Sequence, residues 1–331
     1  MSSRAAGGSE AHVAQAARDA MTRGNAVDAV VTGVLVAAAE SPGVFLGPVQ
    51  LLVGVAGAGL LAVDGRVRQP GLGIPRPRGV LAGEPVPAPA RIGVPALPAA
   101  LATVLAALGA TTLQRVAAPA VEWARARSPE RADVLRRFAQ RGAAAMTDDA
   151  LVGELAAVAG RAAGGMLTLD DLVAVRPTLV SCDEPSLAPS GILRIPWRQG
   201  APQGAATHVV AVADGRGLVA IACYEVPGDG VAIASLGLSA PAFASPVMRG
   251  EARVRPGEPR TAAAPIALRA HRGVVDLAMG LAQTEDPELH LEALLAHLDE
   301  AGALLTALRA ARGRPVAITR TGDNAAVLAS G

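Results

Sequence analysis

The chain has 331 residues, of which 51% are hydrophobic and only 2% aromatic, so its core must be built mainly from Ala, Val and Leu. The formal net charge is +1 and no block of basic residues occurs, which argues against a nucleic-acid-binding surface. No stretch has the roughly 20 uninterrupted apolar residues that a membrane-spanning helix needs. Neither a nucleic acid nor a membrane is therefore expected as a partner.

The N-terminal residues, the cysteines and the histidines bear on the cellular compartment and on metal binding. No apolar segment follows Arg4, so no secretory signal is predicted and a cytoplasmic protein is expected. Cys182 and Cys223 are far apart in the sequence and are interpreted as buried reduced thiols, with a disulfide or a reactive thiol as the alternatives. The five histidines show no metal-ligand spacing, and no metal or cofactor is expected.

The first helices have clear start signals. Residues 9–23 form an amphipathic pattern, and a second helix is predicted over 26–40. Asn25 can cap this second helix, with Asp28 three residues later as in a capping box. Because the helix over 26–40 is apolar nearly all round, it should be buried between layers.

Strands and further helices follow in blocks. Residues 68–92 are rich in Pro, Gly and Arg and are expected to be extended, and a short helix is expected to start at Thr168. Helices are predicted over 95–108, 113–127, 130–163 and 287–312. Strands are predicted over 49–53, 59–63, 190–195, 207–213, 217–223, 231–235, 315–319 and 325–329, with two more within 264–278. Strand pairs near both ends imply one domain whose sheets draw on both halves of the chain.

Several stretches resemble segments of one family in the same order. RGNAVDAVVTGVLVAAAESPG (23–43) is similar to a Gly-Gly-Asn-Ala-Val-Asp-Ala-Ala helix and the turn after it, and LLAVDGRVRQPG (60–71) to an Asp-x-Arg-Glu-x-x-Pro segment. GGMLTLDDLVAVRP (164–177) resembles Gly-Gly-Leu-Thr-x-Glu-Asp-Leu, and ATHVVAVADGRGLVAIA (206–222) a Thr-Thr-His strand. These segments belong to the gamma-glutamyltransferase (gamma-glutamyltranspeptidase) family. The competing interpretation is an unrelated α/β protein with accidental Ala/Gly similarity.

The resemblance implies an N-terminal-nucleophile hydrolase-like αββα sandwich, with two stacked sheets flanked by helices. It implies a single domain over 1–331, in which 1–205 corresponds to the large subunit and 206–331 to the small subunit. In the family, the precursor cleaves itself before the first Thr of Thr-Thr-His. The hydroxyl of that Thr then acts as nucleophile and its freed amine as base, and a gamma-glutamyl group is transferred from glutathione or a related amide without a cofactor.

The resemblance also assigns candidate site residues. Arg66 matches the arginine that binds the substrate carboxylate, the alternatives being an exposed loop arginine or an ion pair with Asp64. Ala206 stands at the nucleophile position, and a methyl group cannot attack an amide. Thr207 matches the second threonine and is the candidate catalytic residue only if cleavage occurs at the Ala206–Thr207 bond. His208 is interpreted as a structural strand residue.

Other site positions also depart from the family. The family's Thr and Asn after the catalytic strand fall on Ala222 and Tyr224, its paired serines on Thr261 and Ala262, and its oxyanion glycines on Gly280 at most. The sequence therefore predicts a catalytically impaired or non-catalytic homologue that stays unprocessed and acts by binding a gamma-glutamyl or other small molecule, a protein partner or a second copy. The alternative is an active threonine-nucleophile hydrolase or transferase, acting on glutathione-like amides after cleavage before Thr207.

Overall fold

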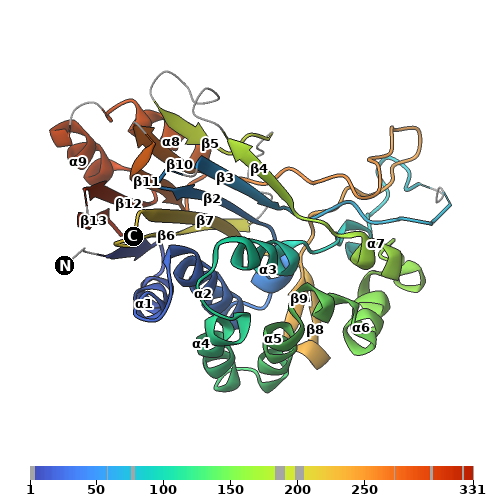
Figure 1. The fold of residues 1–331 in the computed structure, drawn as a ribbon. Helices are drawn as coiled ribbons and strands as arrows, with labels where there is room; N and C mark the ends of the chain where they lie inside the picture. Colours follow the sequence, from blue (N-terminus) through green and yellow to red (C-terminus); the bar gives the residue numbers. More distant parts are fainter. Residues whose placement is uncertain are drawn as a thin grey trace.

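The computed structural model describes residues 4–57, 59–75, 79–182, 191–197, 205–271, 273–298, 301–322 and 324–330. Two antiparallel sheets are stacked face to face, with helices covering the outer face of each (Figure 1). The first sheet has the order β1-β6-β7-β2-β3-β4 and the second has the order β13-β12-β11-β10-β5. This is the αββα sandwich that the family resemblance implied.

The first sheet combines strands from the two parts of the chain. Its strands, in sheet order, are β1 (Ala5–Gly8), β6 (Ala205–Ala213), β7 (Leu218–Pro227), β2 (Val49–Val55), β3 (Gly59–Gly65) and β4 (Thr178–Cys182). Strands β2 and β3, predicted over 49–53 and 59–63, pair with each other as a hairpin, and β2 also pairs with β7. The central strands are thus contributed by segments far apart in the sequence.

The second sheet is made almost entirely from the C-terminal part. Its strands are β13 (Asn324–Ala329), β12 (Arg314–Thr321), β11 (Val274–Ala282), β10 (Ile266–His271) and β5 (Ile192–Arg194). A separate small hairpin joins β8 (Val231–Ile233) and β9 (Leu238–Ala240).

The helical layer on the first sheet follows the predicted order. It contains α1 (Ala11–Ala20), α2 (Ala26–Glu40), α3 (Leu97–Leu108), α4 (Leu113–Arg125), α5 (Pro129–Arg141), α6 (Asp149–Ala159) and α7 (Leu169–Ala174). Helices α2 and α7 start at the predicted residues Asn25 and Thr168, through capping boxes with Asp28 and Asp171. Helix α2 is buried along all but its last residue, because it packs under the first sheet and contacts α1 and α4 on its sides.

The helical layer on the second sheet corrects one prediction. The single helix expected over 287–312 is two helices, α8 (Pro287–Leu295) and α9 (Ala301–Ala310). Leu291 and Leu294 of α8 and Leu304 and Leu308 of α9 share one hydrophobic cluster with the outer face of β11. A break between the helices lets both sets of leucines reach the same face of the sheet, which one straight helix would not allow.

Among the strands that the structure describes, three lie outside the predicted set. They are β1, with the sequence AAGG, together with β4 and β9. A tetrapeptide of Ala and Gly has no strand propensity, and β1 forms because its backbone pairs with β6 from Ala5↔Ala213 to Gly8↔Val210.

Both cysteines are free and buried, as the sequence predicted. Over the described ranges, no helix is both long and apolar enough to cross a bilayer.

Candidate functional site

On strand β6, the side chain of Thr207 points toward the second sheet, and those of Ala206 and His208 point toward the helices. Further along β6, Val209 and Ala211 belong to the hydrophobic cluster between the sheets, whereas Val210 belongs to the cluster under the helices. Since side chains alternate along a strand, Thr207 shares the inter-sheet face, and Ala206 and His208 are on the helical face. Ala206 is exposed, and Thr207 is 2% exposed.

The Thr207 hydroxyl faces a carboxyl group. Thr207 pairs with Glu225 in the β6–β7 ladder, so the two side chains project from the same face. Glu225 is 1% exposed, and its Oε1 accepts a hydrogen bond from the backbone N–H of Ala263 at 3.0 Å. Neither Thr207 Oγ1 nor Glu225 Oε2 has a hydrogen-bond partner among the described residues. Burial raises the pKa of Glu225 to about 7.

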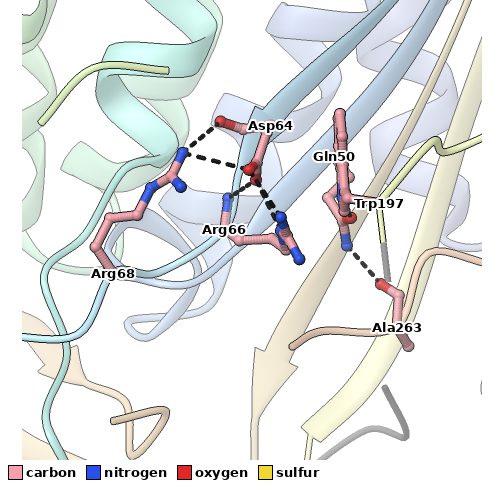
Figure 2. Close-up of polar contacts among 6 residues, drawn as sticks. All are labelled: Gln50, Asp64, Arg66, Arg68, Trp197 and Ala263. Carbon is pink, nitrogen blue, oxygen red and sulfur yellow. Dashed lines mark hydrogen bonds and ion pairs between the residues drawn. The ribbon is translucent and has the colours of Figure 1, made fainter. Parts of the chain in front are cut away.

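Other polar groups hold Ala263 against this end of the first sheet. Gln50 Nε2 and Cys223 Sγ both donate to the Ala263 carbonyl oxygen, at 3.0 and 3.5 Å (Figure 2 shows the Gln50 contact). Trp197 Nε1 donates to Gln50 Oε1 at 2.6 Å. Burial raises the pKa of the Cys223 thiol well above its usual value, so Cys223 is a neutral donor and not a nucleophilic thiolate.

The residue after Ala263 also donates its backbone N–H to a carboxyl group. The backbone N–H of Ala264 donates to Glu288 Oε1 at 2.9 Å, and Arg194 forms an ion pair with the same carboxylate. Two consecutive N–H groups of one loop are therefore bound by two carboxyl groups: that of Ala263 by Glu225 and that of Ala264 by Glu288. We define Thr207, Glu225, Cys223 and Gln50 with residues 262–264 as the inter-sheet polar cluster.

Arg66 is paired with Asp64. Its Nε and Nη2 lie 2.9 and 3.0 Å from the two carboxylate oxygens, and the guanidinium lies 5.2 Å from the centre of the Trp197 ring. Asp64 also pairs with Arg68 at 3.3 Å, so one carboxylate lies between two arginines (Figure 2). Arg66 is 7% exposed, so the exposed-loop interpretation is wrong and the ion pair with Asp64 is present.

His208 lies on the opposite side of β6, in a second polar group. Its Nδ1 is 3.3 Å from Ser9 Oγ and 3.4 Å from Glu10 Oε2, and its ring stacks on Tyr224. The Tyr224 hydroxyl donates to Glu10 Oε2 at 2.7 Å. Burial lowers the pKa of His208 and is the main cause that raises the pKa of Tyr224. His208 is thus a buried strand residue turned away from Thr207.

The residues that lie close to the Thr207 side chain are not the ones that the sequence indicated. Ala222 and Tyr224, the positions that sequence reasoning assigned to the family's polarising Thr and Asn, belong to the core under the helices and face away from Thr207. The residues of β7 that share the Thr207 face and lie nearest to it are Cys223 and Glu225. The register of this hairpin decides which residues these are. Ala213 lies opposite Val219 across residues 214–218, whereas a two-residue turn at Asp214–Gly215 would have placed Ala222 opposite Thr207.

The remaining predicted positions lie in the loop before β10 and in β11. Ala262 is buried beside Ala263 and carries no hydroxyl, and Thr261 lies next to it in the same loop. Gly280 lies inside β11, where an added Cβ would be 2.7 Å from Cγ1 of Val209. Gly280 therefore allows the two sheets to approach closely, which is a packing role.

Comparisons with known proteins bear on the fold. No family model and no curated protein match the sequence. Among solved structures, LmbA2991HD has a TM-score of 0.71 at 14% identity, covering 98% of this chain and 96% of its own. A cephalosporin acylase from Bacillus halodurans has a TM-score of 0.71 at 15% identity, covering 96% of this chain and 92% of its own.

A gamma-glutamyltranspeptidase from Pseudomonas nitroreducens, complexed with L-DON, is also similar. It has 19% identity and a TM-score of 0.43, and the match covers 52% of this chain and 64% of that one, too little to support an argument. The matches over nearly the whole chain establish the architecture and leave the activity open. The chain therefore has the αββα fold of N-terminal-nucleophile hydrolases, as its resemblance to the gamma-glutamyltransferase family implied.

Proposed function

We propose that this protein is a gamma-glutamyltransferase-like homologue that stays unprocessed and is catalytically impaired, acting by binding instead of turnover. The observation that carries the proposal is the position of the Ala206–Thr207 bond. This bond lies inside the β6–β7 ladder, between the cross-strand partners Val226 and Glu225. Self-cleavage would require the Thr207 hydroxyl to attack the Ala206 carbonyl carbon, distorting a paired strand.

The state of the hydroxyl also supports the proposal. Thr207 Oγ1 has no hydrogen-bond partner in the part of the chain that the structure describes, so no acceptor there lies within hydrogen-bond distance of its proton. At the position that the resemblance assigns to the nucleophile, the exposed methyl of Ala206 faces the helical side.

The carboxylate-binding arginine supports the same proposal. Arg66 contacts both oxygens of Asp64, and a substrate carboxylate would have to compete with this buried ion pair. A gamma-glutamyl substrate is therefore expected to bind weakly at Arg66.

Intact-mass measurement of the purified full chain tests the proposal. A single species of 33.1 kDa is expected, with no release of nitroaniline from gamma-glutamyl-p-nitroanilide. Two fragments divided between Ala206 and Thr207, together with nitroaniline release, would overturn it. Thr207→Ala is the matched control, because it keeps the strand and removes the hydroxyl.

One observation favours the alternative, an active threonine-nucleophile enzyme formed by cleavage before Thr207. Glu225 faces Thr207, and its pKa of about 7 suits proton transfer near neutral pH. If this second function is correct, the wild-type chain splits on storage at pH 7.5 and both Thr207→Ala and Glu225→Gln stay intact. An intact wild-type chain excludes it.

A further inference from the structure

A groove opens on the helical layer, on the opposite side of the first sheet from the inter-sheet polar cluster. It has a volume of about 720 Å³ and is lined by α1, α2 and α4 and by residues next to α1 and α4. Helix α2 packs against both α1 and α4, so it forms the floor and the other two helices form the walls. Figure 1 shows these helices below the sheet, with α8 and α9 on the other side of the sandwich. We call this the α1–α4 groove.

The middle of the groove is apolar. Val36 and Val116 contribute branched aliphatic side chains. On the α1 side the lining residues Ala16 and Ala20 have small side chains that take up little of the groove. Thr32 also lines it, but its hydroxyl already donates to the backbone oxygens of Asp28 and Val116. This part of the groove suits a hydrocarbon body.

One end is closed by an aromatic stack. The rings of His12 and Trp123 are 5.3 Å apart and 14° from parallel. Trp123 Nε1 donates to Glu40 Oε2 at 2.6 Å, which fixes the indole. The Nε2 atom of His12 is buried and makes no hydrogen bond to any described residue. An unsatisfied buried polar atom is costly, and a bound hydrogen-bonding group would remove that cost. Because this atom is inaccessible while the rings are stacked, a ligand group reaches it only when the His12 ring turns toward the groove.

The other end carries positive charge. Because the start of α1 contacts the end of α4 through His12 and Trp123, the two helices run in opposite directions along the groove. Arg23, which follows α1, and Arg115, in the first turn of α4, are therefore at the same end. Both are exposed, and over the described ranges neither guanidinium forms an ion pair or a hydrogen bond.

The acidic groups at this end are already engaged. The Asp28 carboxylate accepts from the backbone N–H groups of Asn25, Ala110 and Thr111. Asp19 accepts from Gln15 Nε2 at 2.8 Å. Asp19 is exposed and keeps its charge, because Gln15 is a neutral donor, whereas Asp28 is buried. The two arginines therefore outnumber the one exposed carboxylate at this mouth, and the excess positive charge is complementary to an anion.

We propose that the α1–α4 groove binds a small amphiphilic carboxylate. The carboxylate lies between Arg23 and Arg115, the hydrocarbon body lies over α2, and a terminal hydrogen-bonding group reaches His12 Nε2. His12 and Arg23 are 11 residue steps apart, with Arg23 three residues beyond the end of α1. At the rise of an α-helix this is about 16 Å, which sets the length of the ligand. This site is independent of the proposed function, because its residues and its test involve neither Thr207 nor Arg66.

Binding is measured by calorimetry on the full chain with 10-hydroxydecanoate, decanoate and decan-1-ol. Saturable binding to one site is expected, strongest for the hydroxy acid and weakest for the alcohol. The double variant R23Q/R115Q should weaken binding of 10-hydroxydecanoate by about ten-fold, which corresponds to about 1.4 kcal/mol. His12→Phe, which keeps a ring for the stack, should abolish the difference between 10-hydroxydecanoate and decanoate.

Arg125→Gln is the matched control, since Arg125 lies on α4 outside the groove and pairs with Glu122 on the surface. It should leave binding unchanged. Trp123 can be followed separately by fluorescence in a Trp197→Phe background, because the chain has only two tryptophans.

Three outcomes would overturn the proposal. They are no binding of either carboxylate probe at millimolar concentration, equal loss in the Arg125→Gln control, and a change of sedimentation coefficient in R23Q/R115Q that identifies the groove as a contact between two copies.

Discussion

Thr207 and Glu225 lie directly opposite one another in the β6–β7 ladder, and both side chains are buried on the face that meets the second sheet. One contributes a hydroxyl and the other a carboxyl with a pKa near neutrality. Their chemical groups are those of a catalytic site, a hydroxyl opposite a carboxyl. Their backbones, however, are continuous paired strands, and their burial is that of a hydrophobic core. This combination leads to the first two predictions.

The Glu225 carboxyl should make stability fall as the pH rises. Its pKa is raised from 4.5 to about 7 in the folded state, so the folded chain binds the proton more tightly than the unfolded chain. The favourable contribution is complete below pH 4.5 and is lost between there and about 7, at a cost of about 3 kcal/mol. Urea unfolding at pH 5 and 8 measures this.

Glu225→Gln mimics the protonated carboxyl and keeps an oxygen for the Ala263 N–H. We expect the difference between wild type and variant to grow from pH 5 to 8, with the variant more stable at pH 8. A variant whose pH profile parallels that of the wild type would show that Glu225 does not titrate in this range.

Ala206→Thr should not restore self-cleavage. The side chain at position 206 projects to the helical side, where His208 and Tyr224 are stacked, so the new hydroxyl faces away from Glu225. Intact mass after several days at pH 7.5 should show one undivided chain. Cleavage together with turnover of gamma-glutamyl-p-nitroanilide in this single variant would contradict the account of β6 given above.

Gly280→Ala should destabilise the sandwich. The added methyl would lie 2.7 Å from Val209 Cγ1 and 3.1 Å from Ile266 Cγ2, so the sheets must shift at a cost of about 1–3 kcal/mol. Urea unfolding measures the loss, and the double variant G280A/V209A should recover part of it. Gly153→Ala in α6 is the control, because no atom lies within 4 Å of its added Cβ, and it should be neutral or stabilising.

Asp64→Asn should be strongly destabilising. Arg66 and Arg68 are 7% and 8% exposed, and the substitution leaves both charges buried without the carboxylate that pairs with them. A loss of about 3–5 kcal/mol is expected in urea unfolding. Asp133→Asn, which breaks an exposed ion pair with Arg136, should change stability by less than about 1 kcal/mol. Equal effects at the two positions would show that the Asp64 pair adds no more than a surface contact.

Local signals predicted most of the elements. Asn25 with Asp28, and Thr168 with Asp171, start helices because a side-chain oxygen and a backbone N–H meet within one turn, whatever the rest of the fold does. The β2–β3 hairpin follows from an apolar run interrupted by glycines. Strand β1 could not be predicted, since Ala5–Gly8 has no pattern of its own and becomes a strand only by pairing with β6.

The candidate site was predicted only in part. Arg66 and Thr207 could be selected from motif spacing, but the side of β6 on which Thr207 lies depends on the packing of two sheets. Glu225 had no motif signal. It is distinguished by burial and by facing Thr207, which are properties of the β6–β7 register and of the loop at Ala263.

By itself the sequence determined where helices begin, which segments are apolar enough to be buried, and that Ala206 has no hydroxyl. These depend on side-chain chemistry and on contacts within a few residues. Only the tertiary structure decided that Thr207 faces Glu225, that Asp64 lies between Arg66 and Arg68, and that α1 and α4 enclose a groove over α2. Each of these brings together residues whose contact depends on strand pairing or layer packing, and burial then sets the energies of their charges.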